Sequence, residues 1–317
     1  MFIRMIVYKE LSSLQKDLGI PLDRLYAVSN SISRHYKRKC LPRRDGGVRE
    51  LYCPDGVLKE IQRRILDVII AHIPISPYAT AYRHGVGARA AALPHLGKEK
   101  LLKLDIRGFF DSIRYTQVKE RVFPASHFCE PARILLSMLC YFRDRLPQGA
   151  PTSPAISNVI MREFDLGVAS FCEARGIAYT RYCDDMAFSG SFDESEVIGF
   201  VAAQLRAEGF CLNREKTGVY TRGARQSVIG IVTNSAPAVP REYKASIRRE
   251  LYYIRKFGLD SHIERAGITE EGEKYLASLL GRIAYSLSIE PGNAELISAR
   301  ADVIKLIKDN KYLYFPQ

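Results

Sequence analysis

The chain has 317 residues, 47% of them hydrophobic and 26% charged, so it is long enough for about two domains with a sizeable core. Its net charge of +12 predicts a polyanionic partner, either nucleic acid or an acidic membrane surface. Because no apolar run reaches the roughly 18–20 residues of a membrane span and the seven cysteines include no Cys-x-x-Cys pair, we expect a cytoplasmic protein with reduced thiols that binds nucleic acid and no membrane.

The N-terminal part is predicted to be mainly helical. Helices are expected over the first forty residues, and they end in a basic cluster at 34–47, "RHYKRKCLPRRDGG", which is either a solvated loop or a binding surface. A short strand, "VRELYCP" (48–54), is stopped by Pro54. The segment 55–73 predicts an amphipathic helix, because apolar residues recur at spacings of three and four: Leu58, Ile61, Ile65, Val68 and Ile69.

The middle of the chain alternates strands and helices. An apolar strand, "KLLKLDI" (100–106), ends at Asp105, and strands are expected on both sides of Asp184 and Asp185 in "IAYTRYCDDMAFSG". Further helices are predicted near 115–122, 130–142, 155–176 and 194–210, with short strands near 218–221 and 227–233. From about residue 236 the pattern is mostly helical. The expected fold is therefore an α+β body followed by a helical C-terminal domain.

Asp184 and Asp185 form an adjacent pair of acids, which in a turn is more often structural than functional. Here Asp185 is followed at once by the apolar strand "MAF", and Asp105 ends another apolar strand. Three carboxylates at strand ends can meet on one sheet face and hold two divalent cations, which cancel the repulsion between the acids. Mg²⁺ prefers oxygen ligands, and a pair of such ions assists phosphoryl transfer. We therefore predict a site for two Mg²⁺ ions.

Four segments resemble the sequence boxes of reverse transcriptases, in the family's order: "KLDIRGFFDSI" (103–113), "LPQGAPTSPAISN" (146–158), "YCDD" (182–185) and "LNREKTGVY" (212–220). The resemblance runs from about Arg49 to Ile289. It implies a right-hand polymerase with fingers, a palm whose antiparallel sheet carries the catalytic Asp residues, and a helical thumb. We expect N-terminal helices with interleaved fingers and palm over 1–235, with a palm core near 100–115 and 150–235, and a thumb over 236–317.

The resemblance implies catalytic roles for four side chains. Asp105, Asp184 and Asp185 would hold the two Mg²⁺ ions, and the backbone carbonyl of Ile106 would complete a metal shell. Lys216 would protonate the pyrophosphate leaving group, although a plain surface lysine is the alternative.

The resemblance also implies a nucleotide site. Arg49 would grip the incoming triphosphate, and Phe110 would exclude a ribose 2′-OH, although for one of Phe109 and Phe110 we expect plain core packing. Gln148 and Gly149 would bring backbone amides to the nucleotide, and the alternative is a simple loop before a helix. Four further residues are expected to contact triphosphate or nucleic acid: Arg43, Arg44, Tyr182 and Cys183.

The segment 241–258, "REYKASIRRELYYIRKFG", opens the predicted thumb. One apolar face is expected to pack inward, and it consists of Tyr243, Ile247, Leu251 and Ile254. Three basic residues lie along another face: Lys244, Arg248 and Arg255. We expect these to contact the phosphates of a duplex, and a solvated charged face is the alternative.

The compact length resembles bacterial retron reverse transcriptases, as do "GVGARAAALPHLG", "SVIGIVTN" and "LLGRIAYSLSIEPG". Ala91, Ile229 and Cys183 depart from that pattern, where Asn, Thr and Ala are usual. The resemblance implies an enzyme that copies part of its cognate structured noncoding RNA into branched RNA–DNA, multicopy single-stranded DNA, in antiphage defence. Its partners would be that RNA, its DNA product, dNTPs and an effector or toxin encoded nearby. The alternatives are another stand-alone bacterial defence reverse transcriptase, template-independent or protein-primed, and an RNA-binding scaffold that restrains a toxic effector.

Overall fold

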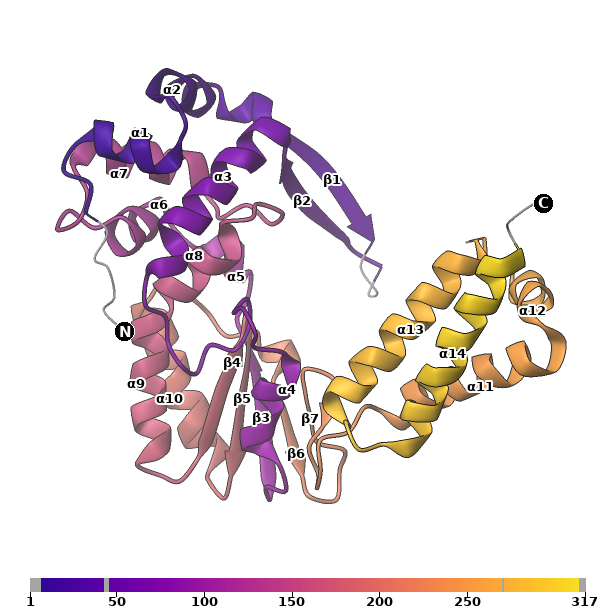
Figure 1. The fold of residues 1–317 in the computed structure, drawn as a ribbon. Coiled ribbons are helices and arrows are strands. Elements are labelled where there is room, and N and C mark those ends of the chain that lie inside the picture. The colour runs from indigo at the N-terminus through magenta and orange to yellow at the C-terminus, as the bar shows by residue number, and fades with distance from the viewer. Residues whose placement is uncertain (1–6, 43–45, 270, 314–317) are drawn as a thin grey trace. The chain divides into compact units, whose positions relative to one another are not determined.

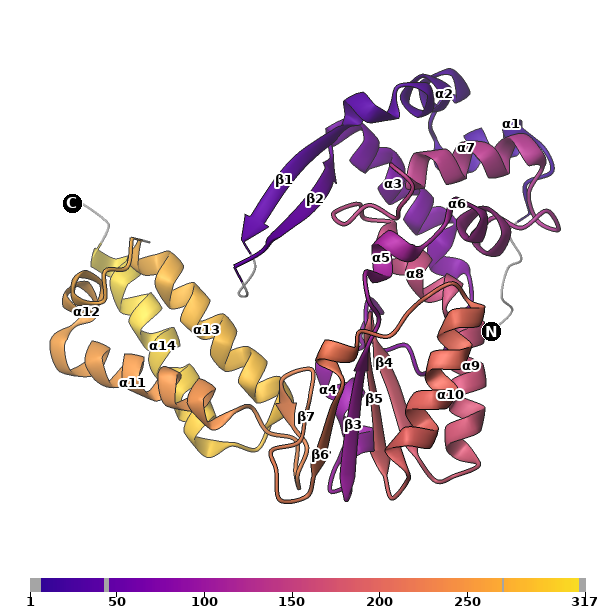
Figure 2. The same ribbon diagram turned by 180° about the vertical axis from the view of Figure 1, so that it is seen from behind.

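The computed structural model describes residues 7–42, 46–269 and 271–313, with side chains up to residue 309. The chain divides into two compact units, which are described separately (Figures 1 and 2). The first unit takes in residues 1–86 and 102–219, and the second takes in 87–101 and 220–317. An α+β body and a helical C-terminal part are both present, which confirms the predicted fold class.

The first unit begins with two helices and a two-stranded ribbon. Helices α1 (Leu11–Leu18) and α2 (Leu22–Asn30) are followed by β1 (Tyr36–Pro42), which pairs antiparallel with β2 (Val48–Pro54). The prediction of helices over the first forty residues is therefore wrong for 36–40. Beyond Tyr36 every side chain of β1 is exposed, so the strand has no alternation between buried and exposed positions. Hydrogen bonding to β2 therefore stabilises β1 as a strand. The two-stranded ribbon of β1 and β2 projects from the helices (Figure 1).

Helix α3 (Gly56–Val68) shows why the predicted amphipathic segment folds as it does. Asp55 caps its N-terminus, because the Asp55 carboxylate accepts a hydrogen bond from the Leu58 amide at 2.9 Å. Leu58, Ile61 and Ile65 are completely buried. These residues join the main hydrophobic core of the first unit and fix the base of the ribbon.

A four-stranded sheet carries the predicted acidic residues. Its strand order is β4-β5-β3-β6, where the strands span Ala178–Tyr182, Asp185–Gly190, Lys100–Asp105 and Gly218–Thr221. Helices α9 (Arg162–Glu173) and α10 (Glu194–Ala207) lie side by side on one face of the sheet (Figure 2). The C-terminal ends of β3 and β4 and the start of β5 lie at the same end of the sheet, as the sequence predicted.

Between these strands lie the predicted helices and one helical turn that was not predicted, at residues 109–112. They are α5 (Phe109–Ser112), α6 (Tyr115–Gln117), the π-helical turn Val118–Val122, α7 (Glu130–Cys140) and α8 (Ser153–Ile160). The single helix predicted over 155–176 is in fact α8 and α9, which are separated at Met161, where ψ is 2°. No Gly or Pro marks this break, so the sequence carries no signal for it.

The second unit includes a segment from the middle of the chain. This segment contains helix α4 (Ala88–Ala92) and, after it, Gly97, whose amide donates a hydrogen bond to Thr233 O at 2.9 Å. In the C-terminal part, β7 (Ser227–Val228) pairs with β8 (Ile231–Val232). The predicted thumb boundary at 235/236 therefore lies inside this compact unit. These contacts, made by residues distant in sequence, could not be read from local composition.

Four helices form the remainder of the second unit: α11 (Arg241–Phe257), α12 (Leu259–Arg265), α13 (Gly272–Ile289) and α14 (Ala294–Leu313). Ile247, Leu251 and Ile254 of α11 are buried in a separate core against α13 and α14, and Tyr243 packs at its margin. The predicted apolar face of residues 241–258 is thus confirmed. Within the described ranges, no helix has the length and apolar character needed to cross a membrane.

Candidate active site

A pocket of about 1300 Å³ in the first unit brings most of the predicted site residues together. Those that line it are Arg49, Asp105, Ile106, Phe110, Gln148, Gly149, Tyr182, Cys183, Asp184, Asp185 and Lys216. Arg43 and Arg44 lie outside the described residues. The three predicted thumb residues, Lys244, Arg248 and Arg255, belong to the second unit.

Asp105 is the most enclosed of the three acids, with an exposed fraction of 3%. Asn213 Nδ2 donates to its Oδ1 at 3.0 Å, and Lys216 Nζ donates to its Oδ2 at 2.8 Å. Each carboxylate oxygen of Asp105 therefore has a donor from the segment that follows β5 and α10. The next residue, Ile106, donates its amide to Asp184 O at 3.1 Å, which ties the end of β3 to the hairpin turn.

Asp184 lies in a two-residue turn, because Tyr182 pairs with Asp185 across the β4–β5 hairpin. Cys183, at the first turn position, has φ +61°. A positive φ at that position alone is the signature of a type II′ turn, which normally takes glycine there. A non-glycine residue held in this region costs on the order of 1–3 kcal/mol and persists only where its surroundings enforce it.

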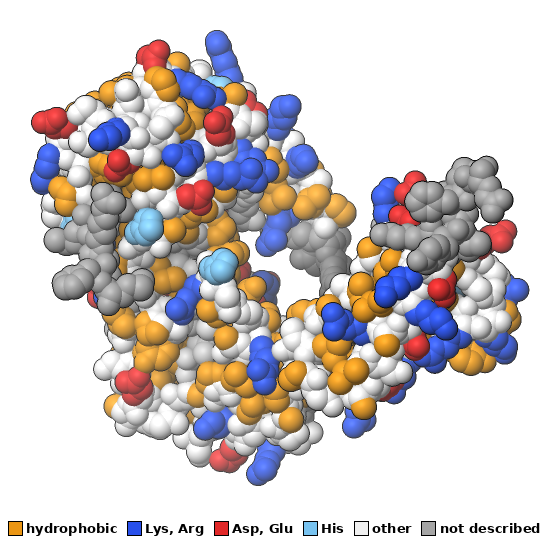
Figure 3. All heavy atoms as spheres, viewed as in Figure 1, with side chains coloured by type: hydrophobic (Ala, Val, Ile, Leu, Met, Phe, Trp, Pro, Cys, Tyr) orange, Lys and Arg blue, Asp and Glu red, His pale blue; other side chains and the backbone are white. Residues whose placement is uncertain are grey.

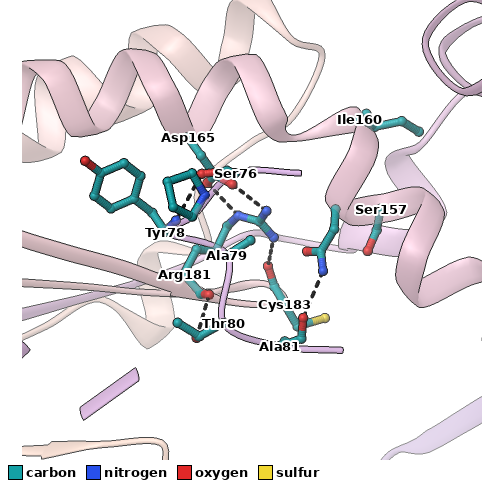
Figure 4. A network of polar contacts seen from close by, with 12 residues as sticks. Ser76, Tyr78, Ala79, Thr80, Ala81, Ser157, Ile160, Asp165, Arg181 and Cys183 are labelled. Atoms are coloured by element: carbon teal, nitrogen blue, oxygen red, sulfur yellow. Dashed lines mark hydrogen bonds and ion pairs between the residues drawn. The ribbon is translucent and has the colours of Figure 1, made fainter. Parts of the chain in front are cut away.

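Buried polar contacts surround this turn (Figure 4). Arg181 is completely buried and forms a two-point ion pair with Asp165 of α9, with Nε–Oδ1 and Nη2–Oδ2 distances of 2.7 and 2.6 Å. Its third donor, Nη1, reaches Cys183 O at 2.9 Å. Nothing in the sequence pattern singled out Arg181 or Asp165, because an ion pair between a helix and a strand has no local signature.

The pocket is electrostatically suited to a cation. Burial raises the pKa of Asp185, and the negative charges of Asp184 and Asp105 raise it further. The hydrogen bond to Asp105 raises the pKa of Lys216, so this lysine is charged at neutral pH. Within the described residues, no three His, Cys, Asp or Glu side chains are already arranged as a metal-binding group, and Lys216 serves as the counter-cation of Asp105. The oxygen-rich donor set nevertheless fits Mg²⁺.

The two adjacent phenylalanines have different environments. Phe109 has an exposed fraction of 3% and packs against Phe210, with 5.7 Å between ring centroids. Phe110 is only partly buried. Both belong to the helical turn α5, so the argument that they alternate on an extended segment is wrong. The conclusion that one of them is core is confirmed for Phe109.

Gly149 has a clear structural requirement. Its φ is +119°, and an added Cβ would lie 3.0 Å from Tyr52 O of β2. The neighbouring Gln148 carbonyl accepts a hydrogen bond from the Tyr52 amide at 3.0 Å. The loop therefore packs against β2, the strand that carries Arg49. Arg49, Gln148 and Gly149 all line the pocket.

Two pocket residues that hydrogen-bond predicted site residues were not identified from the sequence. Asn213, which hydrogen-bonds Asp105, lies three residues before Lys216 in the segment already recognised, so its position offered a signal. Tyr82 donates its hydroxyl to Cys183 Sγ at 3.4 Å, and it comes from a segment without any recognised motif. Burial, with the adjacent Asp184 charge, raises the pKa of the Cys183 thiol to about 12, so Cys183 stays neutral.

Each predicted basic residue of α11 has an acidic partner within the second unit. Lys244 Nζ lies 3.0 Å from both carboxylate oxygens of Glu290. Arg248 pairs with Glu295, and Arg255 pairs with Asp302. These contacts hold α11 to the end of α13 and to α14. They give the three residues a structural role that competes with phosphate binding.

The described residues of α11 include two other exposed cations, Arg241 and Arg249, against which no carboxylate lies. Lys256 is exposed as well and lies over Tyr252, with its Nζ 5.5 Å from the ring centroid. Basic side chains are visible over both units on the face shown in Figure 3. Arg241, Arg249 and Lys256 are thus exposed cations without an acidic partner among the described residues, whereas Arg248 and Arg255 are also more than half exposed but are each paired with an acid.

The comparisons with known proteins agree with the four sequence boxes. Residues 41–254 match the family described as "Reverse transcriptase (RNA-dependent DNA polymerase)". The chain is similar to the retron Mx65 reverse transcriptase of Myxococcus xanthus, with 32% identity over 287 residues, which covers 84% of this chain and 64% of that protein.

Two further curated relatives are similar to this chain. The retron Mx162 reverse transcriptase of Myxococcus xanthus is 30% identical over 284 residues, covering 77% of this chain and 58% of that protein. The retron Ec83 reverse transcriptase of Escherichia coli is 29% identical over 298 residues, covering 86% of this chain and 90% of that protein. The chain thus spans less than two thirds of the length of both Myxococcus proteins.

Proposed function

This chain belongs to the reverse transcriptase (RNA-dependent DNA polymerase) family, and on that basis we propose that it synthesises DNA on an RNA template. Its curated relatives confirm the predicted resemblance to bacterial retron reverse transcriptases. The observation that carries the proposal is the meeting of Asp105, Asp184 and Asp185 in one pocket with Arg49 and Lys216.

The three acids would hold two Mg²⁺ ions, which together activate the attacking hydroxyl and stabilise the leaving oxygen. The Ile106 carbonyl would add a neutral oxygen ligand. Arg49 would bind the triphosphate, and the Gln148–Gly149 loop would place the nucleotide beside Phe110. Lys216 would be the acid that gives a proton to the departing pyrophosphate, since it is charged at neutral pH and more than half exposed.

Substitution of the acids tests the polymerase directly. Asp184→Asn and Asp185→Asn should each abolish Mg²⁺-dependent primer extension on an RNA template while the chain stays folded, because an amide loses the ligand charge but keeps the shape. Asp111→Asn is a matched control, since Asp111 pairs with Arg145 at the pocket margin. Near-normal extension by both Asp184→Asn and Asp185→Asn would contradict the two-metal assignment.

The finer proposal is that the chain is the polymerase of a retron. It would copy part of a structured noncoding RNA into multicopy single-stranded DNA, starting from an RNA 2′-OH, in antiphage defence with an effector protein encoded nearby. An internal hydroxyl must be held in one geometry at the metal site, and such positioning lowers a barrier substantially. Recognition of folded RNA relies on shape and 2′-OH contacts more than on base readout in a duplex.

Nucleic acid purified with the protein from its native locus tests this finer proposal. We expect an RNA joined to single-stranded DNA through a 2′–5′ linkage, which a debranching enzyme separates. The DNA should be complementary to the adjacent noncoding RNA. Linear DNA of unrelated or homopolymeric sequence would favour a template-independent or protein-primed defence enzyme instead. RNA bound without any DNA would favour a scaffold that restrains an effector.

A further inference from the structure

Arg181 has the largest fully buried side chain among the described residues, and it lies two residues before Cys183. Three guanidinium nitrogens have acceptors: Nε and Nη2 contact Asp165, and Nη1 contacts Cys183 O. The ion pair with Asp165 would balance the charge without the third bond. That third bond links a buried charge pair to the turn that presents the catalytic acids.

The acceptor of this bond is well placed to control the turn. Cys183 O belongs to the peptide group that joins Cys183 to Asp184, so a donor fixed against it sets the orientation of that peptide. The next carbonyl, Asp184 O, accepts from the Ile106 amide at 3.1 Å. Two consecutive peptide groups are thus held, and together they set the direction in which the Asp184 side chain leaves the backbone.

The donor itself is rigidly anchored. Asp165 also accepts a hydrogen bond from Tyr179 Oη at 2.8 Å, so both the acid and the guanidinium are fixed. The backbone of Arg181 donates to Tyr78 O at 2.9 Å, and its carbonyl accepts from the Thr80 amide at 2.8 Å. A charged donor held at this many points is preorganised to impose a conformation on its acceptor.

The turn needs such a constraint. Cys183 has a left-handed backbone, φ +61°, which glycine adopts freely and other residues avoid. We propose that Arg181, anchored by Asp165, is a positioning residue that holds the Cys183 peptide in this conformation and so aims Asp184 and Asp185 at the metal site beside Asp105. The proposal rests on the proposed two-metal function, and it assigns Arg181 no contact with substrate.

The competing explanation is that the buried pair only stabilises the fold. Removing Arg181 alone would leave Asp165 as an uncompensated buried charge, which itself disrupts folding. The informative variant therefore replaces the whole group, as Asp165→Leu with Tyr179→Phe and Arg181→Met. Replacing a buried pair by apolar residues of similar volume is often neutral for stability. Tyr179→Phe alone is the matched control, because it removes one anchor bond and keeps the guanidinium.

Mn²⁺ is the probe, with free Mn²⁺ followed by electron paramagnetic resonance, so that binding is measured apart from catalysis. In the folded triple variant we expect the Mn²⁺ dissociation constant to rise about tenfold, or about 1.4 kcal/mol, with duplex affinity unchanged. A rise of less than threefold would overturn the proposal, whatever the polymerase rate. If the triple variant does not fold, the Mn²⁺ dissociation constant of Arg181→Lys is judged by the same threefold limit. Lysine keeps the positive charge but lacks the planar guanidinium that bonds Asp165 and Cys183 O together.

A rescue experiment separates positioning from general damage. Adding Cys183→Gly to the triple variant should restore at least part of the Mn²⁺ affinity, because glycine adopts the positive φ without a clamp. No recovery would show that the turn conformation was not the cause of the loss. If the parental protein binds Mn²⁺ in this Arg181-dependent way but extends no primer, the proposed function fails and the positioning role stands.

Discussion

Lys216 Nζ lies 2.8 Å from Asp105 Oδ2, so a mostly exposed lysine side chain is held against a buried aspartate side chain, with exposed fractions of 61% and 5%. The ion pair neutralises the most buried acid of the pocket. A Mg²⁺ ion that binds Asp105 must therefore compete with Lys216 for the same oxygen. This competition makes the affinity of the site for metal and the position of the proposed proton donor interdependent.

Lys216→Met should consequently have two opposite effects. The rate of nucleotide addition should fall by about 10²–10⁴-fold, the usual contribution of a general acid. The Mg²⁺ concentration for half-maximal activity should decrease, because the competing ammonium is gone. Lys216→Arg is the control, since it keeps the charge but is a poor proton donor. A Met variant with a parental rate would leave Lys216 as a surface lysine.

Phe110→Ala should open the pocket beside the sugar and raise ribonucleotide incorporation relative to deoxynucleotides. Phe109→Ala is its matched control. Because Phe109 is core, that change should cost about 3–5 kcal/mol of stability, and folded protein should keep the parental sugar preference. The measurement is competition between the two nucleotides in primer extension, together with thermal unfolding. Unchanged sugar selection by the Phe110 variant would show that another residue excludes the 2′-OH.

The ion pair between Lys244 and Glu290 predicts a stability effect. Glu290 also accepts hydrogen bonds from the Val239 amide and from Asn293 Nδ2, both at 2.8 Å, so it joins three segments. Lys244→Glu places like charges together and should destabilise the second unit by about 1–3 kcal/mol. Adding Glu290→Lys should recover part of this loss in denaturant unfolding. Equal stability of parent and single variant would mean that the pair contributes nothing.

Duplex binding should also depend on Arg241 and Arg249, the exposed arginines of α11 that have no acidic partner among the described residues. Arg241→Gln with Arg249→Gln should weaken binding to an RNA–DNA duplex and flatten its log–log salt dependence by about 0.9 for each lost phosphate contact. Arg300→Gln, an exposed arginine of α14, is the control. Titrations at several salt concentrations provide the slopes. If the variant that combines Arg241→Gln and Arg249→Gln keeps the parental slope, these two arginines are merely solvated.

His95 predicts how stability responds to acid. The side chain is fully buried, and this burial lowers its pKa to about 4. Between about pH 6.5 and 4 the unfolded chain therefore binds more protons than the folded chain, so stability falls as the pH falls through this range. The full loss is on the order of 3 kcal/mol. His95→Gln should unfold with a weaker pH dependence over the same range, and an identical dependence would contradict this origin.

The sequence by itself determined much of the fold and identified many of the residues that line the pocket. Local apolar periodicity located α3 and α11, and strands were evident on both sides of Asp184 and Asp185. The ordered boxes placed Asp105, Gln148 and Lys216 in one site without any coordinates. These features are local, or are carried by motifs whose spacing the chain itself displays.

Only the tertiary structure decided which side chains serve each other across the fold. The Arg181–Asp165 clamp, the Asn213 bond to Asp105 and the pairing of Lys244 with Glu290 join residues 16, 108 and 46 positions apart. The sequence did not predict β1 for the same reason. Its side chains are mostly exposed, so it is stabilised as a strand by hydrogen bonds to β2 and not by a local apolar pattern. Such contacts depend on how separate elements pack. The partner of a buried charge such as Arg181 can be identified only when the positions of β4 and α9, which carry Arg181 and Asp165, are known.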